Sequence, residues 1–131
     1  GGSEIGCRVA RRVLQISSVP AFLSHVNRLS LMFNAGVAML MKKHPEFLKG
    51  FRQLGLMMGL KLADEISGPI LTKAAYDNEL LMLYANNDTS VCQFLPPLVM
   101  EEEQADWVIE KLDKALYAAE SMRSFLMQGG K

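Results

Sequence analysis

The sequence contains few of the residues that build metal centres and disulfide frameworks. Its 131 residues include two cysteines, Cys7 and Cys92, and two histidines, His25 and His44. These residues lack the paired spacing of zinc ligands and the density of a secreted disulfide scaffold. We therefore expect two reduced thiols in a cytoplasmic protein and no metal site.

The sequence also lacks an excess of charge of one sign and a long apolar run. Lys and Arg together number 14, as do Asp and Glu, so the formal net charge is zero. Without a basic excess, neither a nucleic-acid surface nor a basic membrane-binding surface is expected. No apolar run approaches the roughly 20 residues that span a bilayer, and the first residues do not resemble a signal peptide.

The composition that remains is typical of one folded domain. Half of the residues are hydrophobic and 21% are charged, which does not indicate disorder. A chain of this length is expected to form a single domain, residues 1–131, with a buried core. The nine methionines are expected to fill gaps in that core, because the methionine side chain is flexible and apolar.

Three stretches carry apolar residues at the spacing of an amphipathic helix. They predict helices over residues 3–15, over residues 20–43 and from about Glu102 onward. Gly36 lies inside the second helix, where glycine costs about 1 kcal/mol relative to alanine. We expect a close crossing with another helix at this position.

The middle of the chain changes to the period of β-strands. In residues 51–62, leucine and methionine alternate with glycine, methionine and lysine, which predicts one strand with a strongly apolar face. Gly55 and Gly59 would share its other face and admit a closely packed element. Residues 80–84 and 91–94 predict two further short strands, and Gly68-Pro69 is expected to open a helix that ends near Asn78.

These elements predict an α/β (α+β) fold. Three short strands cannot bury themselves alone, so amphipathic helices must cover them. We expect a two-layer sandwich with a small antiparallel or mixed sheet of about three strands. The sequence contains no nucleophile elbow, no phosphate-binding P-loop and no glycine fingerprint after a strand, so no catalytic residue is assigned.

Three motifs in the right order nevertheless resemble one enzyme family. Gly1-Gly2-Ser3 precedes Ile5-Gly6-Cys7; Arg52 precedes Gly55-Leu56-Met57-Met58-Gly59, with Gln53 and Leu54 departing from the pattern; and Phe94, Pro96-Pro97-Leu98 precede Glu102-Glu103. In these residues the chain resembles the C-terminal small domain of a class III aminotransferase of the ornithine, acetylornithine and 4-aminobutyrate type. Members of this family depend on pyridoxal phosphate and have the small-domain fold of fold-type I aminotransferases.

The resemblance implies that the large, cofactor-binding domain is absent from this chain. The full-length enzyme would be a cytoplasmic dimer or other homo-oligomer that uses pyridoxal phosphate, an amine and a 2-oxo acid. The chain alone would hold no cofactor stably and would be inactive, with the large domain as its partner. Four lysines could suggest a Schiff base, but the family's lysine lies upstream, so we reject Lys42, Lys43, Lys61 and Lys73.

The resemblance also implies that Gln93 and Phe94 contact substrate. Many family members carry an arginine at the position of Gln93, where it pairs with a substrate carboxylate. A neutral amide at this position suggests a diamine, a polyamine or an ω-amine as donor, or a carboxylate held by another residue. Alternatively, Gln93 simply ends a strand at the surface.

Other candidate residues have a structural interpretation beside the functional one. Arg52 contacts substrate or a partner subunit, or else forms a salt bridge at a strand start, which we favour. Pro96-Pro97 lines the substrate entrance or only shapes a turn, and Trp107 is expected to be a packing anchor. A different class of function also remains: a stand-alone interaction or regulatory module that kept the fold and lost the chemistry.

Overall fold

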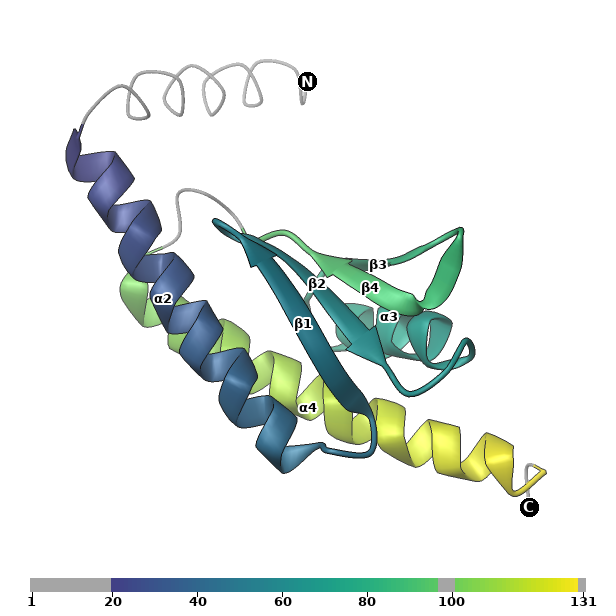
Figure 1. The fold of residues 1–131 in the computed structure, drawn as a ribbon. Helices are drawn as coiled ribbons and strands as arrows, with labels where there is room; N and C mark the ends of the chain where they lie inside the picture. Colours follow the sequence, from purple (N-terminus) through teal and green to yellow (C-terminus); the bar gives the residue numbers. More distant parts are fainter. Residues whose placement is uncertain (1–19, 97–100, 130–131) are drawn as a thin grey trace, which may run out of the picture.

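The computed structural model describes residues 20–96 and 101–129 (Figure 1). Along the chain it contains α2 (Pro20–Lys43), β1 (Leu48–Leu54), β2 (Met57–Leu62), α3 (Ser67–Asp77), β3 (Met82–Ala85), β4 (Asp88–Phe94) and α4 (Glu102–Met127). Helix α2 begins and ends where the amphipathic pattern places it, and α4 begins at the predicted Glu102. The helix predicted over residues 3–15 lies outside the described residues.

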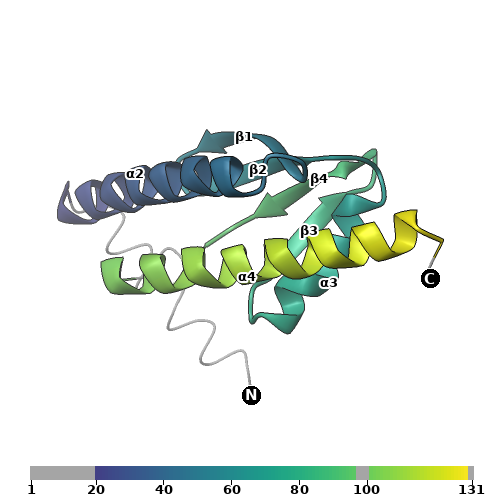
Figure 2. The same cartoon turned by 90° about the horizontal axis from the view of Figure 1, so that it is seen from below.

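The four described strands form one antiparallel sheet in the order β1-β2-β4-β3. The helices lie against one face of this sheet, with α2 beside β1 and α4, and α3 beside β3, β4 and α4 (Figures 1 and 2). The structure therefore confirms a two-layer α/β sandwich, with four strands where the sequence predicts about three. Within the described ranges, no helix is both long and apolar enough to cross a membrane.

The fourth strand arises because residues 51–62 form a hairpin and not one strand. Leu54 ends β1, Gly55 and Leu56 make the turn, and Met57 begins β2. Gly55 has a φ of 59°, a backbone conformation that glycine adopts without strain. The turn also reverses the phase of the apolar alternation. Met58 is buried, whereas Leu54 is 77% exposed and shares a face with its cross-strand partner Met57.

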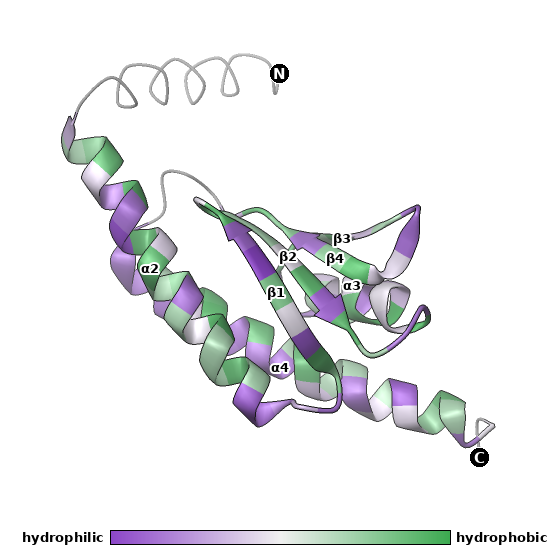
Figure 3. Ribbon diagram, viewed as in Figure 1, coloured by the Kyte–Doolittle hydropathy of each residue, from purple (hydrophilic) through white to green (hydrophobic). Residues whose placement is uncertain are grey.

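The core lies between the helices and the inner face of the sheet. Phe33 of α2 and Phe94 of β4 meet edge to face, with their ring centroids 6.0 Å apart. Figure 3 shows hydrophobic residues distributed along α2, α4 and the strands, as this packing requires. The expectation that most methionines fill the core is wrong. Among the described methionines only Met58 and Met82 are buried. Met32 and Met41 are partly buried against the core, and the remaining ones, Met39, Met57, Met122 and Met127, are exposed.

Gly36 marks the close approach of α2 and α4, as predicted. A Cβ atom at Gly36 would lie 2.7 Å from Cδ1 and 2.8 Å from Cγ1 of Ile109. Both distances are shorter than non-bonded carbon atoms tolerate, so Ile109 occupies the space of a missing side chain. The predicted close packing at Gly55 and Gly59 is wrong for the described residues, because nothing there lies within 4 Å of either Cβ position.

The C-terminal end of α2 is attached to α4 by a buried histidine that sequence reasoning left without a role. The His44 side chain is fully buried; its Nε2 lies 2.7 Å from Asp113 Oδ1, and its Nδ1 contacts Glu120 Oε1. Both ring nitrogens of His44 therefore face a carboxylate of α4, one from Asp113 and one from Glu120. Lys43 Nζ adds a contact of 2.6 Å to Asp113 Oδ2.

Replacing Gly36 by leucine is expected to separate the two long helices. The added side chain must displace Ile109, and overpacking of this kind costs about 1–3 kcal/mol of unfolding free energy. Ile109→Ala in the same protein should restore part of the loss, which chemical denaturation measures as a coupling energy. Ala35→Leu, at an exposed position one residue earlier in the same helix, is the control. Equal stability of the two leucine variants would contradict the close crossing.

Asp113 gives the protein a stability that depends on pH. Partial burial raises the pKa of this carboxyl, but hydrogen bonds from Lys43 and His44 outweigh the burial and leave the pKa below its usual 3.8. Because the folded pKa is the lower one, the stabilisation is complete above 3.8 and is lost as the pH falls through the folded value.

The variant Asp113→Asn tests this contribution. It should lose about 1–3 kcal/mol at pH 7, because His44 keeps only one carboxylate partner. Urea unfolding at several pH values should show the difference from the unaltered protein shrinking below pH 3.8. Asp77→Asn, which removes an exposed i,i+4 pair with Lys73, serves as control. A difference that stays constant down to low pH would refute the assignment.

Candidate functional site

The sheet face opposite the helices, here called the outer face, carries a row of paired residues across all four strands. Arg52 of β1 pairs with Gly59 of β2, Gly59 pairs with Gln93 of β4, and Gln93 pairs with Leu83 of β3. Paired residues in a sheet share one face, and the side chains of Arg52, Gln93 and Leu83 are accordingly exposed. The row brings together two residues that are 41 positions apart in the sequence.

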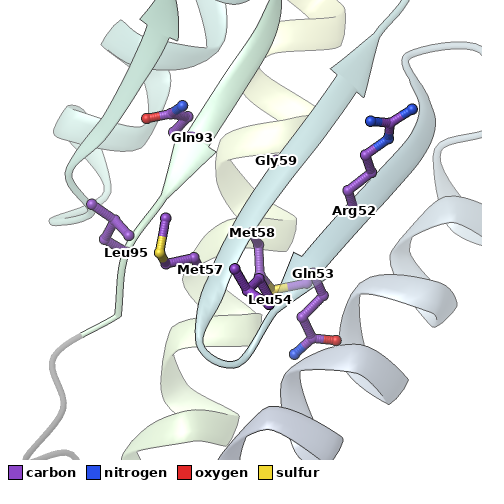
Figure 4. A pocket seen from close by; sticks show the side chains of 8 residues that line it. All are labelled: Arg52, Gln53, Leu54, Met57, Met58, Gly59, Gln93 and Leu95. Atoms are coloured by element: carbon purple, nitrogen blue, oxygen red, sulfur yellow. The ribbon is translucent and has the colours of Figure 1, made fainter.

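A pocket on the outer face, here called the outer groove, contains three residues of this row (Figure 4). It is lined by Arg52, Gln53, Leu54, Met57, Met58, Gly59, Gln93 and Leu95. Figure 4 shows Arg52 on β1 and Gln93 on β4, with Gly59 on the strand between them. Neighbouring strands lie about 4.8 Å apart, so the backbones of Arg52 and Gln93 are separated by roughly 10 Å. Gly59 forms the floor, because no atom lies within 4 Å of its Cβ position.

The tip of the β1–β2 hairpin, beside the groove, is held by Gln53. Its Nε2 donates to the carbonyl oxygens of Ser30 at 2.7 Å and Gly55 at 3.0 Å, and its Oε1 accepts from Asn34 Nδ2 at 2.8 Å. These bonds attach the hairpin to α2. Gln53 departs from the family motif in the sequence, and its anchoring role is visible only once α2 is placed beside β1.

The two residues predicted to bind substrate point to opposite faces of the sheet. Gln93 lies in the outer groove, whereas the Phe94 side chain is 3% exposed and packs against Phe33 in the core. Successive strand residues alternate between faces, so one surface cannot be lined by both side chains. Substrate contact by Gln93 stays a prediction. The Phe94 ring packs in the core, on the helix-covered face of the same strand.

Arg52 has no ion pair or hydrogen-bonded partner among residues 20–96 and 101–129. The favoured interpretation, a salt bridge at a strand start, is therefore wrong for the described part of the chain. The neighbouring cation of the outer face is paired: Lys61 Nζ lies 3.3 Å from Asp88 Oδ2 and 2.5 Å from Ser90 Oγ. Hydrogen bonds from Ser90, and then from Lys61, keep the pKa of the Asp88 carboxyl below its usual value.

Three of the four lysines considered for a Schiff base are paired with carboxylates. A Schiff base needs a lysine whose amine loses its proton readily, in a desolvated pocket. Lys43 and Lys73 are instead paired with Asp113 and Asp77, and the hydrogen bond from Asp113 raises the pKa of Lys43. Lys61 is paired with Asp88. No step of the cofactor's chemistry is therefore assigned to these side chains.

Nucleophilic and metal chemistry are likewise not supported where the structure is described. Burial raises the pKa of the Cys92 thiol to about 11, so it carries no thiolate at neutral pH. Its sulfur lies 3.4 Å from the Gly68 carbonyl oxygen and 3.8 Å from Thr72 Oγ1, against α3. No group of three or more metal-ligating side chains occurs in the described ranges.

Two other predictions concern Trp107 of α4 and the turn after β4. Trp107 is 44% exposed, with Lys111 Nζ 5.2 Å from its ring centroid, so the prediction of a packing anchor is wrong. Pro96 is buried at the end of β4, and Pro97 lies outside the described residues. The role of this turn at a substrate entrance stays a prediction.

Comparison with known proteins gives consistent matches. The sequence profile described as aminotransferase class-III matches residues 1–116. An uncharacterized aminotransferase of Archaeoglobus fulgidus is 40% identical over 126 residues, which cover 96% of this chain and 30% of that protein. The acetylornithine aminotransferase of Rhodobacter capsulatus is 30% identical over 121 residues, 92% of this chain and 30% of its own length.

Solved structures agree in fold. The crystal structure of N-acetylornithine aminotransferase from Stenotrophomonas maltophilia matches with a TM-score of 0.72 and 26% identity, over 86% of this chain and 31% of that one. The lysine aminotransferase from M. tuberculosis has the same TM-score at 21% identity, over 84% of this chain and 25% of that one, and shows the fold alone. The chain spans about 30% of the length of the curated relatives it matches. It belongs to the class-III aminotransferase family.

Proposed function

We propose that this chain is the C-terminal small domain of a pyridoxal-phosphate-dependent transaminase. The enzyme moves an amino group from an amine or amino acid to a 2-oxo acid. The observation that carries the proposal is the alignment of 96% of this chain with only 30% of a 40% identical aminotransferase. A segment of that size supplies one part of a shared site, which agrees with the incomplete chemistry of the described residues.

In the proposed enzyme the cofactor is held by a large domain outside this chain. The carboxylate partners of Lys43, Lys61 and Lys73 agree with this division of labour. The cofactor, when bound there, supplies the electron sink for amino transfer. The present chain contributes the outer face, which covers the substrate, orients it and excludes water. The chain alone is inactive.

The exposed apolar side chains of the outer face support a covering role. Leu54, Leu83 and Leu95 are each at least 60% exposed, and Met57 is 54% exposed. Clusters of this kind mark surfaces that another protein segment or a ligand covers. In the proposed enzyme the large domain covers these apolar side chains. The whole protein is a cytoplasmic homo-oligomer, a dimer whose substrate sites lie near the boundary between the subunits. Without the large domain, the same surface favours self-association.

The chain alone and the full open reading frame that contains it give different expected results. With pyridoxal phosphate, 2-oxoglutarate and a panel of amines, the longer protein should transfer amino groups and the isolated chain should not. Near-ultraviolet absorption of the reduced pyridoxyl group after borohydride treatment and gel filtration is the second measurement. Covalent retention of the cofactor at one lysine of the isolated chain would contradict the proposal. An unrelated sequence upstream would favour a stand-alone interaction module.

The variant Gln93→Arg tests the proposed preference for donors without a carboxylate at this position. It restores a guanidinium on the outer face, where a charge-assisted pair with a carboxylate becomes available. Activity with N-acetylornithine relative to putrescine should rise about tenfold or more, as the energy of such a hydrogen bond implies. The matched control is Gln128→Arg, at the exposed C-terminal end of α4. An unchanged ratio of the two donors would mean that Gln93 only ends a strand.

A further inference from the structure

The outer groove contains the guanidinium of Arg52, which has no counter-ion among the described residues. The other two described arginines are both paired. Arg28 Nε lies 2.7 Å from Glu102 Oε1, and Arg123 binds Asp64 Oδ2 through two nitrogens at 3.0 and 2.8 Å. Arg52 has no such partner within residues 20–96 and 101–129. Its charge is therefore available to an anion from outside.

The shape of the groove beside Arg52 suits a small planar group. Gly59, the cross-strand neighbour of Arg52, leaves its Cβ position without any atom within 4 Å. Any other residue would place a side chain in this space. The floor is therefore open backbone, with the Arg52 guanidinium on one side and the Gln93 amide on the other (Figure 4).

The donors that flank this floor select an acceptor. A guanidinium presents N–H groups in a planar fork and accepts nothing, and the NH2 of a glutamine side chain donates two more hydrogen bonds. A carboxylate matches the fork of the Arg52 guanidinium, since its two oxygens accept two parallel hydrogen bonds. Asp88, which lines a neighbouring pocket of the outer face, is already bound by Lys61 and Ser90, so it leaves the charge of Arg52 uncompensated.

The remaining walls define the rest of the ligand. Leu54, Met57 and Leu95 line the end of the groove next to the hairpin tip. They form an apolar surface directly beside the polar row. A ligand with one carboxylate and a short aliphatic chain would satisfy both parts, whereas a large polyanion would leave the apolar end uncovered.

We propose that Arg52 is the residue that selects the acid substrate of this transaminase by binding its carboxylate. The carboxylate lies over Gly59 and accepts from the guanidinium of Arg52. The positive charge that recognises the acid is thus carried by Arg52 on β1 and not by the residue at position 93 on β4, which is a neutral glutamine. This proposal rests on the proposed function and assigns it a specificity-determining residue.

The kinetic test uses the full-length protein with the variants Arg52→Gln and Arg52→Lys. With a saturating diamine donor, Arg52→Gln should raise KM for 2-oxoglutarate about ten- to hundredfold, as loss of a charge-assisted pair implies. Turnover of butanal, an acceptor without a carboxylate, should stay within about twofold, and Arg52→Lys should recover part of the affinity for the acid. Arg28→Gln, which removes an exposed arginine of α2, is the matched control.

Two results would overturn the role of Arg52. The first is an unchanged KM for 2-oxoglutarate in Arg52→Gln. The second is an equal loss with butanal and 2-oxoglutarate, which indicates a general structural defect. Circular dichroism of each variant confirms that the fold is retained.

Binding of glutarate, a dicarboxylate that cannot accept an amino group, separates this inference from the proposed function. Isothermal titration should detect binding to the unaltered full-length protein and to Arg28→Gln, and none to Arg52→Gln. If the unaltered protein binds glutarate through Arg52 but transfers no amino group, the proposed function fails and the anion site stands. If it transfers amino groups and Arg52→Gln binds glutarate normally, only the inference about Arg52 fails.

Discussion

The one-sided cover of the sheet is the constraint on which the rest of this structure depends. Helices α2, α3 and α4 all pack on one face of the sheet. The strand side chains on that face are therefore buried, and those on the outer face are exposed. Leu60 is fully buried, whereas its neighbour Gly59 forms the floor of an open groove. Because strand residues alternate, the core and the candidate site are built from the same strands. A shift of one residue in register would exchange them.

The helical layer was predictable because its signal is local and long. The apolar repeats over residues 20–43 and from Glu102 each extend over several helical turns. Gly36 indicates where the two helices cross, because it is a glycine inside the apolar stripe of the first helix. The hairpin was missed because the alternation of apolar residues in 51–62 continues through the two-residue turn. After the turn, however, the even-numbered residues lie on the inner face, whereas before it they lie on the outer face. The first three residues of β1, Leu48 to Gly50, were missed as well, because Lys49 and Gly50 do not continue the apolar alternation of a strand.

The site was predictable only as far as a motif could lead. Gln93 was identified by its place in a family pattern, and the structure puts it in a groove, whereas Phe94 next to it is part of the core. The unpaired state of Arg52 depends on which acidic side chains lie near it in space, and spacing along the chain does not contain that information. The same holds for His44, whose partners Asp113 and Glu120 lie 69 and 76 positions away.

The central claim is that the outer face of this sheet covers a substrate whose cofactor is held by another part of the protein. A crystal structure of the full-length protein with pyridoxal phosphate and glutarate tests it most directly. The account predicts the outer face turned toward the cofactor, with a glutarate carboxylate over Gly59 and within hydrogen-bonding distance of Arg52. An outer face open to solvent, or buried against a segment remote from the cofactor, would contradict the account.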